Sequence, residues 1–196
     1  LCTFHKFGLL FLRFYITKSG RKNSFNVIDT DDKNRKVQTF CEELPHSTVS
    51  HAISSFKNNL ISPQEAAKDA DTEIQKEIAS VYGKYENYIA QNNLVDFDDL
   101  LLLPYTILKE FPEVAEESSK KYQYIMVDEY QDTNRLQLEL LKKLCSTHTN
   151  LCVVGDDDQS IYSFRGAVIE NILFFANMFE GAKEVKLEEN YRCGRN

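Results

Sequence analysis

The sequence lacks several features that would assign it to a large class of proteins. Its five cysteines are odd in number and include no Cys-x-x-Cys pair, which argues against a disulfide framework and against a zinc site. It contains no internal repeat and no low-complexity tract. Hydrophobic residues make up 42% of the 196 residues, too many for a disordered chain. We therefore expect one folded domain or two small ones in a reducing compartment.

Long hydrophobic runs are also absent. The apolar opening, residues 7–16, is interrupted by Arg13 and is not followed by a small-residue cleavage site. It is too short for a membrane span and has the wrong pattern for a signal peptide. The sequence therefore predicts a soluble, cytoplasmic protein that does not bind membranes.

A general surplus of positive charge is missing as well. The chain has 23 Lys and Arg against 30 Asp and Glu, a net charge of −7, which argues against a basic nucleic-acid coat. The charge is unevenly spread, because residues 1–36 contain eight basic and three acidic residues. A local basic path along this segment remains compatible with the composition, as does a set of solvated helix faces.

The first 120 residues have the patterns of helices. Residues 62–65 (Ser-Pro-Gln-Glu) are typical of a capping box with proline in the first turn. Apolar residues between 74 and 89 recur at spacings of three and four, which predicts one face of a long helix. Asp29 is expected to cap a helix that continues to about Leu44. Asp96 is expected to cap another.

That helix would run from Phe97 to about Leu103, where Pro104 must end or kink it. The pattern changes near Tyr122. Residues 124–127 and 151–154 are short apolar runs followed by acidic residues, which predict strands buried on both faces of a parallel sheet.

A leucine stripe over residues 136–144 predicts the helix of a right-handed strand–helix–strand unit. A second helix is expected at about 168–179 and a third strand at 184–187. The boundary between the helical front and the α/β back is expected within residues 118–123.

Two carboxylates directly follow the first predicted strand. Asp128 and Glu129 would emerge at its carboxyl end, where open parallel sheets bind ligands. An aspartate there can hold Mg²⁺, and an adjacent glutamate can orient or deprotonate a water, which is the Walker B arrangement of nucleotide hydrolases. The pair could also be a solvated acidic turn before the next helix.

The second strand is followed by a cluster of polar and aromatic residues. Gln159 could bind a phosphate oxygen or a water, and Arg165 could pair with a backbone phosphate. Tyr162 and Phe164 could stack on bases, although such residues, taken alone, are more often core or surface packing.

Several segments resemble motifs of the UvrD/Rep family of superfamily 1 DNA helicases. Residues 128–134 resemble motif II, residues 155–167 motif III and residues 187–192 motif IV. Thr3-Phe4-His5 resembles the DNA-contacting Thr-Phe-His segment of the family, and residues 94–101 resemble a further family block. The matches run along the whole chain in the family's order.

The resemblance implies a nucleotide site for ATP and Mg²⁺. Asp128 would be the magnesium ligand and Glu129 the general base for the attacking water. Gln159 would sense the γ-phosphate and couple hydrolysis to DNA movement. Arg192 would be an arginine finger, and Tyr191 would stack near the adenine.

It also implies a path for single-stranded DNA and for junctions of single and double strands. Thr3, His5, Tyr162, Phe164 and Arg165 would line this path. Phe164 stands where many members have tryptophan, so its grip on a base would be weaker. His5 could instead be a buried, hydrogen-bonded imidazole.

The phosphate loop Gly-x-x-x-x-Gly-Lys-[Ser/Thr] is absent. Of the seven glycines only Gly83 precedes a lysine, and Tyr85 stands where serine or threonine is required. In the family this loop lies upstream of the Thr-Phe-His segment, and the chain begins at Leu1 rather than at a methionine. We therefore expect an internal fragment that neither hydrolyses ATP nor unwinds DNA by itself.

The resemblance predicts an α/β fold in three parts: a helical 1B-like domain (1–121), the C-terminal half of RecA-like domain 1A (122–187), and the start of the second RecA-like domain (188–196). The full protein would be a 3′→5′ helicase acting in repair or replication. An exposed sheet edge and apolar face would favour self-association.

Two alternatives remain open. The first is a helicase subunit of an AddA/RecB-type helicase–nuclease, although those tend to have lysine where this chain has Asp158. The second is a non-catalytic DNA-binding protein that kept the helicase scaffold. Four intact residues of the nucleotide site argue against it: Asp128, Glu129, Gln159 and Arg192.

Overall fold

The structure is a computed structural model that describes residues 1–156, 170–179, 181–187 and 189. Its elements follow in this order: α1 (Phe4–Tyr15), the 3-10 helix η1 (Ile16–Ser19), β1 (Asn26–Val27), α2 (Thr30–Gln38), α3 (His46–Asn58), α4 (Pro63–Lys68), α5 (Glu73–Gln91), β2 (Leu94–Val95), α6 (Asp99–Glu110), α7 (Pro112–Lys121), β3 (Ile125–Val127), the 3-10 helix η2 (Tyr130–Asp132), α8 (Arg135–Leu144), β4 (Leu151–Val153), α9 (Glu170–Leu173) and α10 (Phe175–Met178). The described chain is mostly helical with short parallel strand pairs, which confirms the expected α/β class.

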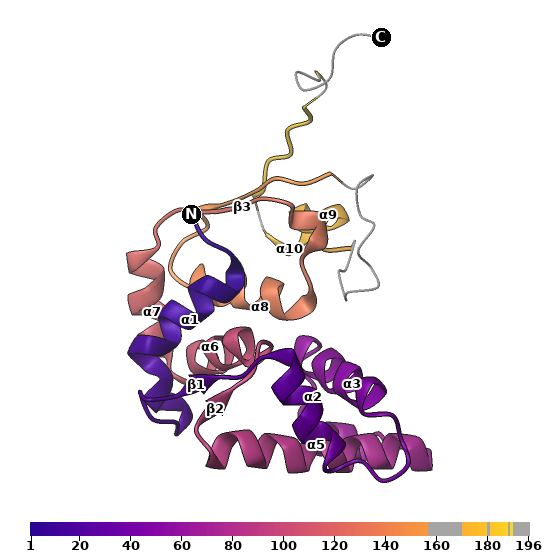
Figure 1. The fold of residues 1–196 in the computed structure, drawn as a ribbon. Coiled ribbons are helices and arrows are strands. Elements are labelled where there is room, and N and C mark those ends of the chain that lie inside the picture. The colour runs from indigo at the N-terminus through magenta and orange to yellow at the C-terminus, as the bar shows by residue number, and fades with distance from the viewer. Residues whose placement is uncertain (157–169, 180, 188, 190–196) are drawn as a thin grey trace.

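Figure 1 shows the elements in three tiers. Helices α2, α3 and α5 lie at one end, β3, α9 and α10 lie at the other, and α6 and α8 lie between them. Helix α1 packs on α6, and α6 packs on α8. The start of the chain therefore lies near the strand pair β3–β4, and Phe4 contacts the apolar cluster beneath those strands.

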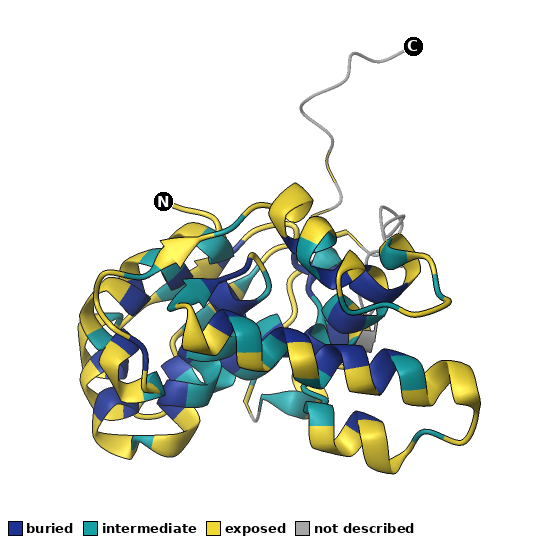
Figure 2. Cartoon of the chain, turned by 60° about the horizontal axis from the view of Figure 1, so that its bottom comes forward, coloured by how far each residue is buried: buried dark blue, intermediate teal, exposed yellow. Residues whose placement is uncertain are grey.

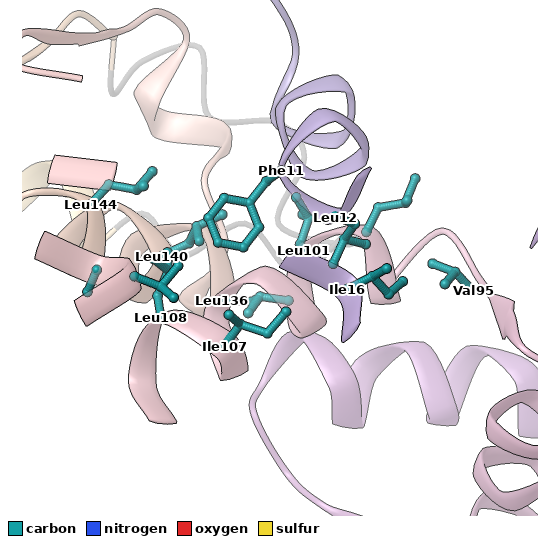
Figure 3. Close-up of a cluster of buried hydrophobic side chains, with 13 residues drawn as sticks. Phe11, Leu12, Ile16, Val95, Leu101, Ile107, Leu108, Leu136, Leu140 and Leu144 are labelled. Atoms are coloured by element: carbon teal, nitrogen blue, oxygen red, sulfur yellow. The ribbon is translucent and has the colours of Figure 1, made fainter. Parts of the chain in front are cut away.

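Three clusters of buried apolar side chains hold the described residues together. The largest joins α1, α6, α7 and α8 (Figure 3) and contains Phe11, Leu12, Ile16, Val95, Leu100, Leu101, Ile107, Leu108, Val114, Ala115, Leu136, Leu140 and Leu144. A second lies among α2, α3, α4 and α5, and a third lies between β3 and α8. Figure 2 shows the buried positions on the inward sides of the helices. Since the largest cluster includes residues from both sides of residue 121, the division into domains remains a prediction.

Two of the predicted helix caps, Ser62 and Asp29, are present. The Ser62 hydroxyl accepts a hydrogen bond from the Glu65 N–H (3.2 Å), and the Glu65 carboxylate accepts one from the Ser62 N–H (2.8 Å). This completes the predicted capping box. Asp29 caps α2 by accepting a hydrogen bond from the Asp32 N–H (2.8 Å). The prediction for Asp96 is wrong: its carboxylate accepts a hydrogen bond from the Asp99 N–H (2.8 Å), but α6 begins at Asp99 rather than at Phe97, and its N-cap residue is Asp98.

Helix α2 is shorter than predicted. It ends at Gln38 rather than near Leu44. The carboxylate of Glu77, on α5, accepts hydrogen bonds from the backbone N–H groups of Glu42, Glu43 and Leu44 at 3.0 to 3.3 Å. The side chain of another helix therefore satisfies these donors, so they need no carbonyl partners in a longer α2.

Pro104 was predicted to end or kink a helix near Leu103, and the first of these two outcomes does not occur. Helix α6 continues through Pro104 to Glu110. Proline has no N–H, so it leaves the Leu100 carbonyl without its usual helical donor. Helix α1 lies directly on this carbonyl at Gly8, where an added Cβ would be 1.7 Å from the Leu100 oxygen. We attribute the tolerance of Pro104 to this tight packing, which holds α6 between α1 and α8.

The predicted parallel strand pair is present, but the described residues cover only one of its faces. Ile125 pairs with Leu151 in the register of β3 and β4. Val127 is buried against the cluster below, whereas Tyr124 and Met126 are 80% and 77% exposed. The prediction of strands buried on both faces is therefore wrong for this chain, because the packed helices lie on one side only.

Two other predictions are corrected near the end of the chain. Residues 184–187 form no strand, because they pair with no other strand of the described residues. The helix expected at 168–179 divides into α9 and α10, since Phe174 leaves the helical conformation with φ −110° and ψ 17°. Residues 168–169 lie outside the described part. The small pair β1–β2, in which Asn26 lies opposite Leu94, was not predicted.

Candidate active site and nucleic-acid interface

The two predicted site carboxylates lie at the carboxyl end of β3. Asp128 and Glu129 directly follow the strand, and both are exposed to solvent. Gly155 and Asp156 follow the neighbouring strand β4 at the same edge. Ligands of open parallel sheets bind at this edge. The structure therefore places both carboxylates where a ligand would bind, and their roles remain predictions.

Glu129 has a strained backbone conformation. Its φ of 51° and ψ of 44° lie in the left-handed region, which costs a non-glycine residue about 1 to 2 kcal/mol. Its N–H donates to the Asp128 carboxylate (3.0 Å), and its carbonyl accepts a hydrogen bond from the Asp132 N–H (3.0 Å). The next residue, Tyr130, donates its N–H to the carbonyl of Val154 (2.9 Å). These bonds to both strand ends hold the turn that directs the two side chains outward.

The side chain of Glu129 is fixed by a residue that the sequence reading missed. Gln131 is 1% exposed, and its Nε2 donates to Glu129 Oε2 at 2.8 Å. Its Oε1 accepts a hydrogen bond from the Asp156 N–H at 3.1 Å. Its position two residues after Glu129 in motif II was the available signal, but the spacing alone does not show that the side chain is buried.

The carboxylates at this edge suit a magnesium ion that is also bound by substrate. Mg²⁺ in nucleotide sites uses one or two carboxylates, several waters and phosphate oxygens rather than a closed protein cage. Asp128 is exposed, and one of its oxygens accepts the Glu129 N–H. Within the described ranges, no group of three or more metal-binding side chains forms such a cage. The donor set therefore fits an ion held between Asp128 and a nucleotide.

The helix after motif II is joined to the helical end of the molecule. Asn134 caps α8 through a capping box with Gln137. The Asn134 amide also donates to Asn58 Oδ1 on α3 (2.7 Å), and the Asn58 amide donates to Asp98 Oδ1 (2.9 Å). A chain of hydrogen bonds thus connects the start of α8 with the family block at residues 94–101.

The predicted DNA-contacting residues at the start of the chain have structural partners. Thr3 is exposed and caps α1 by accepting a hydrogen bond from the Lys6 N–H (3.2 Å). The His5 ring stacks on Phe97, with ring centroids 4.0 Å apart. Burial lowers the pKa of His5 and outweighs the opposing effect of Asp98. The lowered pKa favours the neutral ring at pH 7. His5 is therefore a stacked, half-buried imidazole.

Phe97 is a second residue that the sequence reading did not assign. It is 57% exposed although it is large and apolar, and it forms one side of the His5 stack. A stacked pair with an open aromatic face is a suitable platform for a nucleobase. The other predicted site residues lie outside the described residues: Gln159, Tyr162, Phe164, Arg165, Tyr191 and Arg192.

The comparison with known families now bears directly on this geometry. The UvrD/REP helicase N-terminal domain matches residues 1–180, which include the Thr3–His5 segment, the block at residues 94–101 and motif II. The chain belongs to the UvrD/REP helicase family.

Relatives in this helicase family support the assignment. The ATP-dependent DNA helicase PcrA of Staphylococcus epidermidis strain RP62A is 38% identical over an alignment of 204 residues, gaps included. The alignment covers 100% of this chain and 28% of that protein. The ATP-dependent DNA helicase PcrA of Staphylococcus aureus strain Mu50 is 40% identical over 201 residues, which cover 98% of this chain and 27% of that protein. The chain thus spans just over a quarter of the length of these relatives.

In this UvrD/REP family member, the block at residues 94–101 contains a buried ionic cluster. Lys57 is fully buried, and its Nζ lies 2.9 Å from Asp96, 2.8 Å from Asp99 and 2.7 Å from Glu86. Lys33 adds a contact of 3.5 Å to Asp96. Burial alone would lower the pKa of Lys57, but the carboxylates outweigh it and hold that pKa well above its ordinary value. The acidic residues of this block therefore join α3 to α6 rather than face solvent.

No helix in the described ranges of this helicase chain is both long enough and apolar enough to span a bilayer.

Proposed function

We propose that this chain is part of an ATP-dependent DNA helicase that moves 3′→5′ along single-stranded DNA and unwinds duplexes in repair or replication. The observation that carries the proposal is the turn after β3, where Asp128 and Glu129 are held outward beside Asp156 at the ligand-binding edge of the sheet. Family membership and two relatives named ATP-dependent DNA helicase PcrA support it.

In the proposed nucleotide site, Asp128 holds Mg²⁺ together with the ATP phosphates. The ion, when bound, supplies positive charge against the phosphate oxygens. Glu129 accepts a proton from the attacking water, and its exposed carboxylate is oriented by the hydrogen bond from Gln131. Gln159 senses the γ-phosphate, Arg192 acts as arginine finger and Tyr191 stacks near the adenine, as the family motifs imply.

In the proposed DNA path, the strand runs past the first turn of α1 and the segment that follows β4. Thr3 and His5 contact the strand at one point, with the His5 ring supported by Phe97. Tyr162 and Phe164 stack on bases, and Arg165 pairs with a phosphate, as motif III implies. The substrate would be single-stranded DNA or a junction of single and double strands.

We further propose that the 196-residue chain is inactive alone, because it contains no phosphate loop. The exposed sheet face around Tyr124 and Met126 would be covered by other parts of the protein, and in the isolated chain would promote self-association. The proposed location is the cytoplasm.

Strand displacement by the full-length protein tests the proposal. Duplex DNA with a 3′ single-stranded tail should be unwound in the presence of ATP and Mg²⁺, and duplex with a 5′ tail should not. Glu129→Gln should abolish unwinding while leaving DNA binding intact. Unwinding that is unaffected by Glu129→Gln would refute the assigned base, and preference for the 5′ tail would refute the polarity.

A further inference from the structure

Gln131 joins the two chain segments that end at the ligand-binding edge of the sheet. Its amide nitrogen donates to the Glu129 carboxylate (2.8 Å), and its amide oxygen accepts from the Asp156 N–H (3.1 Å). Both partners are therefore held by one planar group. Gln131 itself is 1% exposed, so its amide is largely shielded from water, although its partner Glu129 is exposed.

The space for this side chain depends on a glycine. A Cβ added at Gly155 would lie 2.6 Å from Gln131 Oε1 and 3.2 Å from its backbone nitrogen. It would also lie 2.8 Å from Ile172 Cδ1, so a larger residue at this position would press on both the Gln131 amide and the Ile172 side chain. A residue of motif II, Gln131, and the first residue of motif III, Gly155, are thus fitted against each other.

The position of the Glu129 carboxylate depends strongly on this amide. Glu129 is exposed and has left-handed backbone angles, so its side chain has few other constraints. Within the described residues, the Gln131 amide is the side chain that donates a hydrogen bond to this carboxylate. A general base must lie within hydrogen-bond reach of the water that it activates, and a displacement of about 1 Å can cost about 100-fold in rate.

We infer that Gln131 is a positioning residue that couples the backbone of the segment after β4 to the catalytic carboxylate of Glu129. The inference rests on the proposed function, in which Glu129 is the general base. Asp156 directly precedes the residues that motif III assigns to the DNA path. A shift of the Asp156 backbone on DNA binding would move the Gln131 amide, and that amide would in turn reorient Glu129. The amide is a mechanical link by which DNA accelerates hydrolysis.

Two substitutions separate the two hydrogen bonds. Gln131→Glu keeps an oxygen that accepts the Asp156 N–H but replaces the donor with an acceptor that repels the Glu129 carboxylate. Gln131→Leu removes both bonds. Gly155→Ala disturbs the same amide without changing its chemistry. Gln137→Glu is the matched control, because Gln137 only accepts the Asn134 N–H in a capping box (2.9 Å) that glutamate serves equally well.

The test is steady-state ATP hydrolysis by the full-length protein, with and without single-stranded DNA. For Gln131→Glu we expect kcat to fall by about tenfold or more under both conditions, with KM for ATP changed by less than about twofold. For Gln131→Leu we expect the same loss and, in addition, a smaller ratio of kcat with DNA to kcat without it. Gly155→Ala should lower that ratio, and Gln137→Glu should match the wild type.

The outcomes distinguish this inference from the proposed function. Thermal unfolding and DNA affinity near the wild-type values show that each variant is folded. A loss of kcat in folded variants with unchanged KM supports the positioning role. Values of kcat and DNA stimulation within about twofold of an active wild type, in both Gln131 variants, overturn the inference while the proposed function stands. A wild-type protein without DNA-stimulated hydrolysis overturns both.

Discussion

Replacing the buried Lys57 with methionine should strongly destabilise the chain. Lys57 has no exposed surface, and its ammonium contacts Asp96 and Asp99, whose side chains are each 1% exposed. Methionine fills nearly the same volume, so Lys57→Met removes the charge and leaves little cavity. Two buried carboxylates would then lose the cation that offsets their burial, while Glu86 is 24% exposed and can turn to water.

The expected magnitude follows from this geometry. Removing one partner of a buried ion pair costs about 3 to 5 kcal/mol, because the remaining charge is left uncompensated. Arg21 and Lys33 still contact the cluster at 3.7 Å and 3.5 Å, and they keep the loss near the lower end of that range. In a chain of this size each kcal/mol lowers Tm by about 2 to 4 °C, so we expect Tm to fall by at least about 6 °C.

Urea unfolding of the 196-residue chain at pH 7.5, followed by far-ultraviolet circular dichroism, measures the effect. Lys76→Met is the matched control. Its ammonium lies 2.8 Å from Glu73 in an exposed pair, and such pairs contribute about 0 to 1 kcal/mol. The double variant Lys57→Met/Asp99→Asn should recover part of the loss, because it removes one of the stranded charges.

Equal stability of the two lysine variants would refute the reasoning. It would mean that water reaches the carboxylates, or that they bind protons at little cost. A double variant that is less stable than Lys57→Met would contradict the specific claim that Asp99 is the stranded charge.

Three further predictions test other parts of the account. Burial and the neighbouring Asp96 raise the pKa of Asp99 to about 7, so the folded state keeps a proton that the unfolded chain loses near pH 4. The free energy of unfolding should therefore fall as pH rises between these values. Urea titrations at several pH values should show a flatter slope for Asp99→Asn, and an unchanged slope would refute the assignment. Gly8→Ala would press a methyl group onto the Leu100 carbonyl, and thermal unfolding should show a loss of about 1 to 3 kcal/mol. In the control Gly83→Ala the new Cβ would meet only Pro63, at 4.0 Å, so this variant should be more stable by about 0.5 to 1 kcal/mol. Equal effects of the two variants would contradict the close approach of α1 and α6. Asn134→Ala removes the cap of α8 and the hydrogen bond to Asn58, and should lower the free energy of unfolding by about 1 kcal/mol or more in thermal unfolding. An unchanged stability would show that the hydrogen bond between Asn134 and Asn58 is not formed.

Local signals predicted much of the fold. The apolar runs of β3 and β4 and the capping box of α4 depend on residues within a few positions of each other, and the structure contains all of them. Asp128 and Glu129 could be placed at a strand end for the same reason. The family motifs added roles that periodicity alone does not give.

Features that depend on distant residues could not be predicted in this way. Helix α2 ends early because Glu77, more than 30 residues away, takes the next backbone donors. Pro104 is tolerated because Gly8 brings α1 onto the helix. Lys57 has the spacing of a solvated lysine, and only packing shows that it is buried among acids. Gln131 was missed because its two partners lie on different strands.

ATP hydrolysis measured with and without single-stranded DNA tests the central claim most directly. The full-length protein should show turnover that DNA stimulates and that Glu129→Gln abolishes, and the 196-residue chain alone should show none above background. Full-length turnover that is indifferent to both DNA and Glu129→Gln would contradict the claim that the carboxylates after β3 form the catalytic site of a DNA helicase.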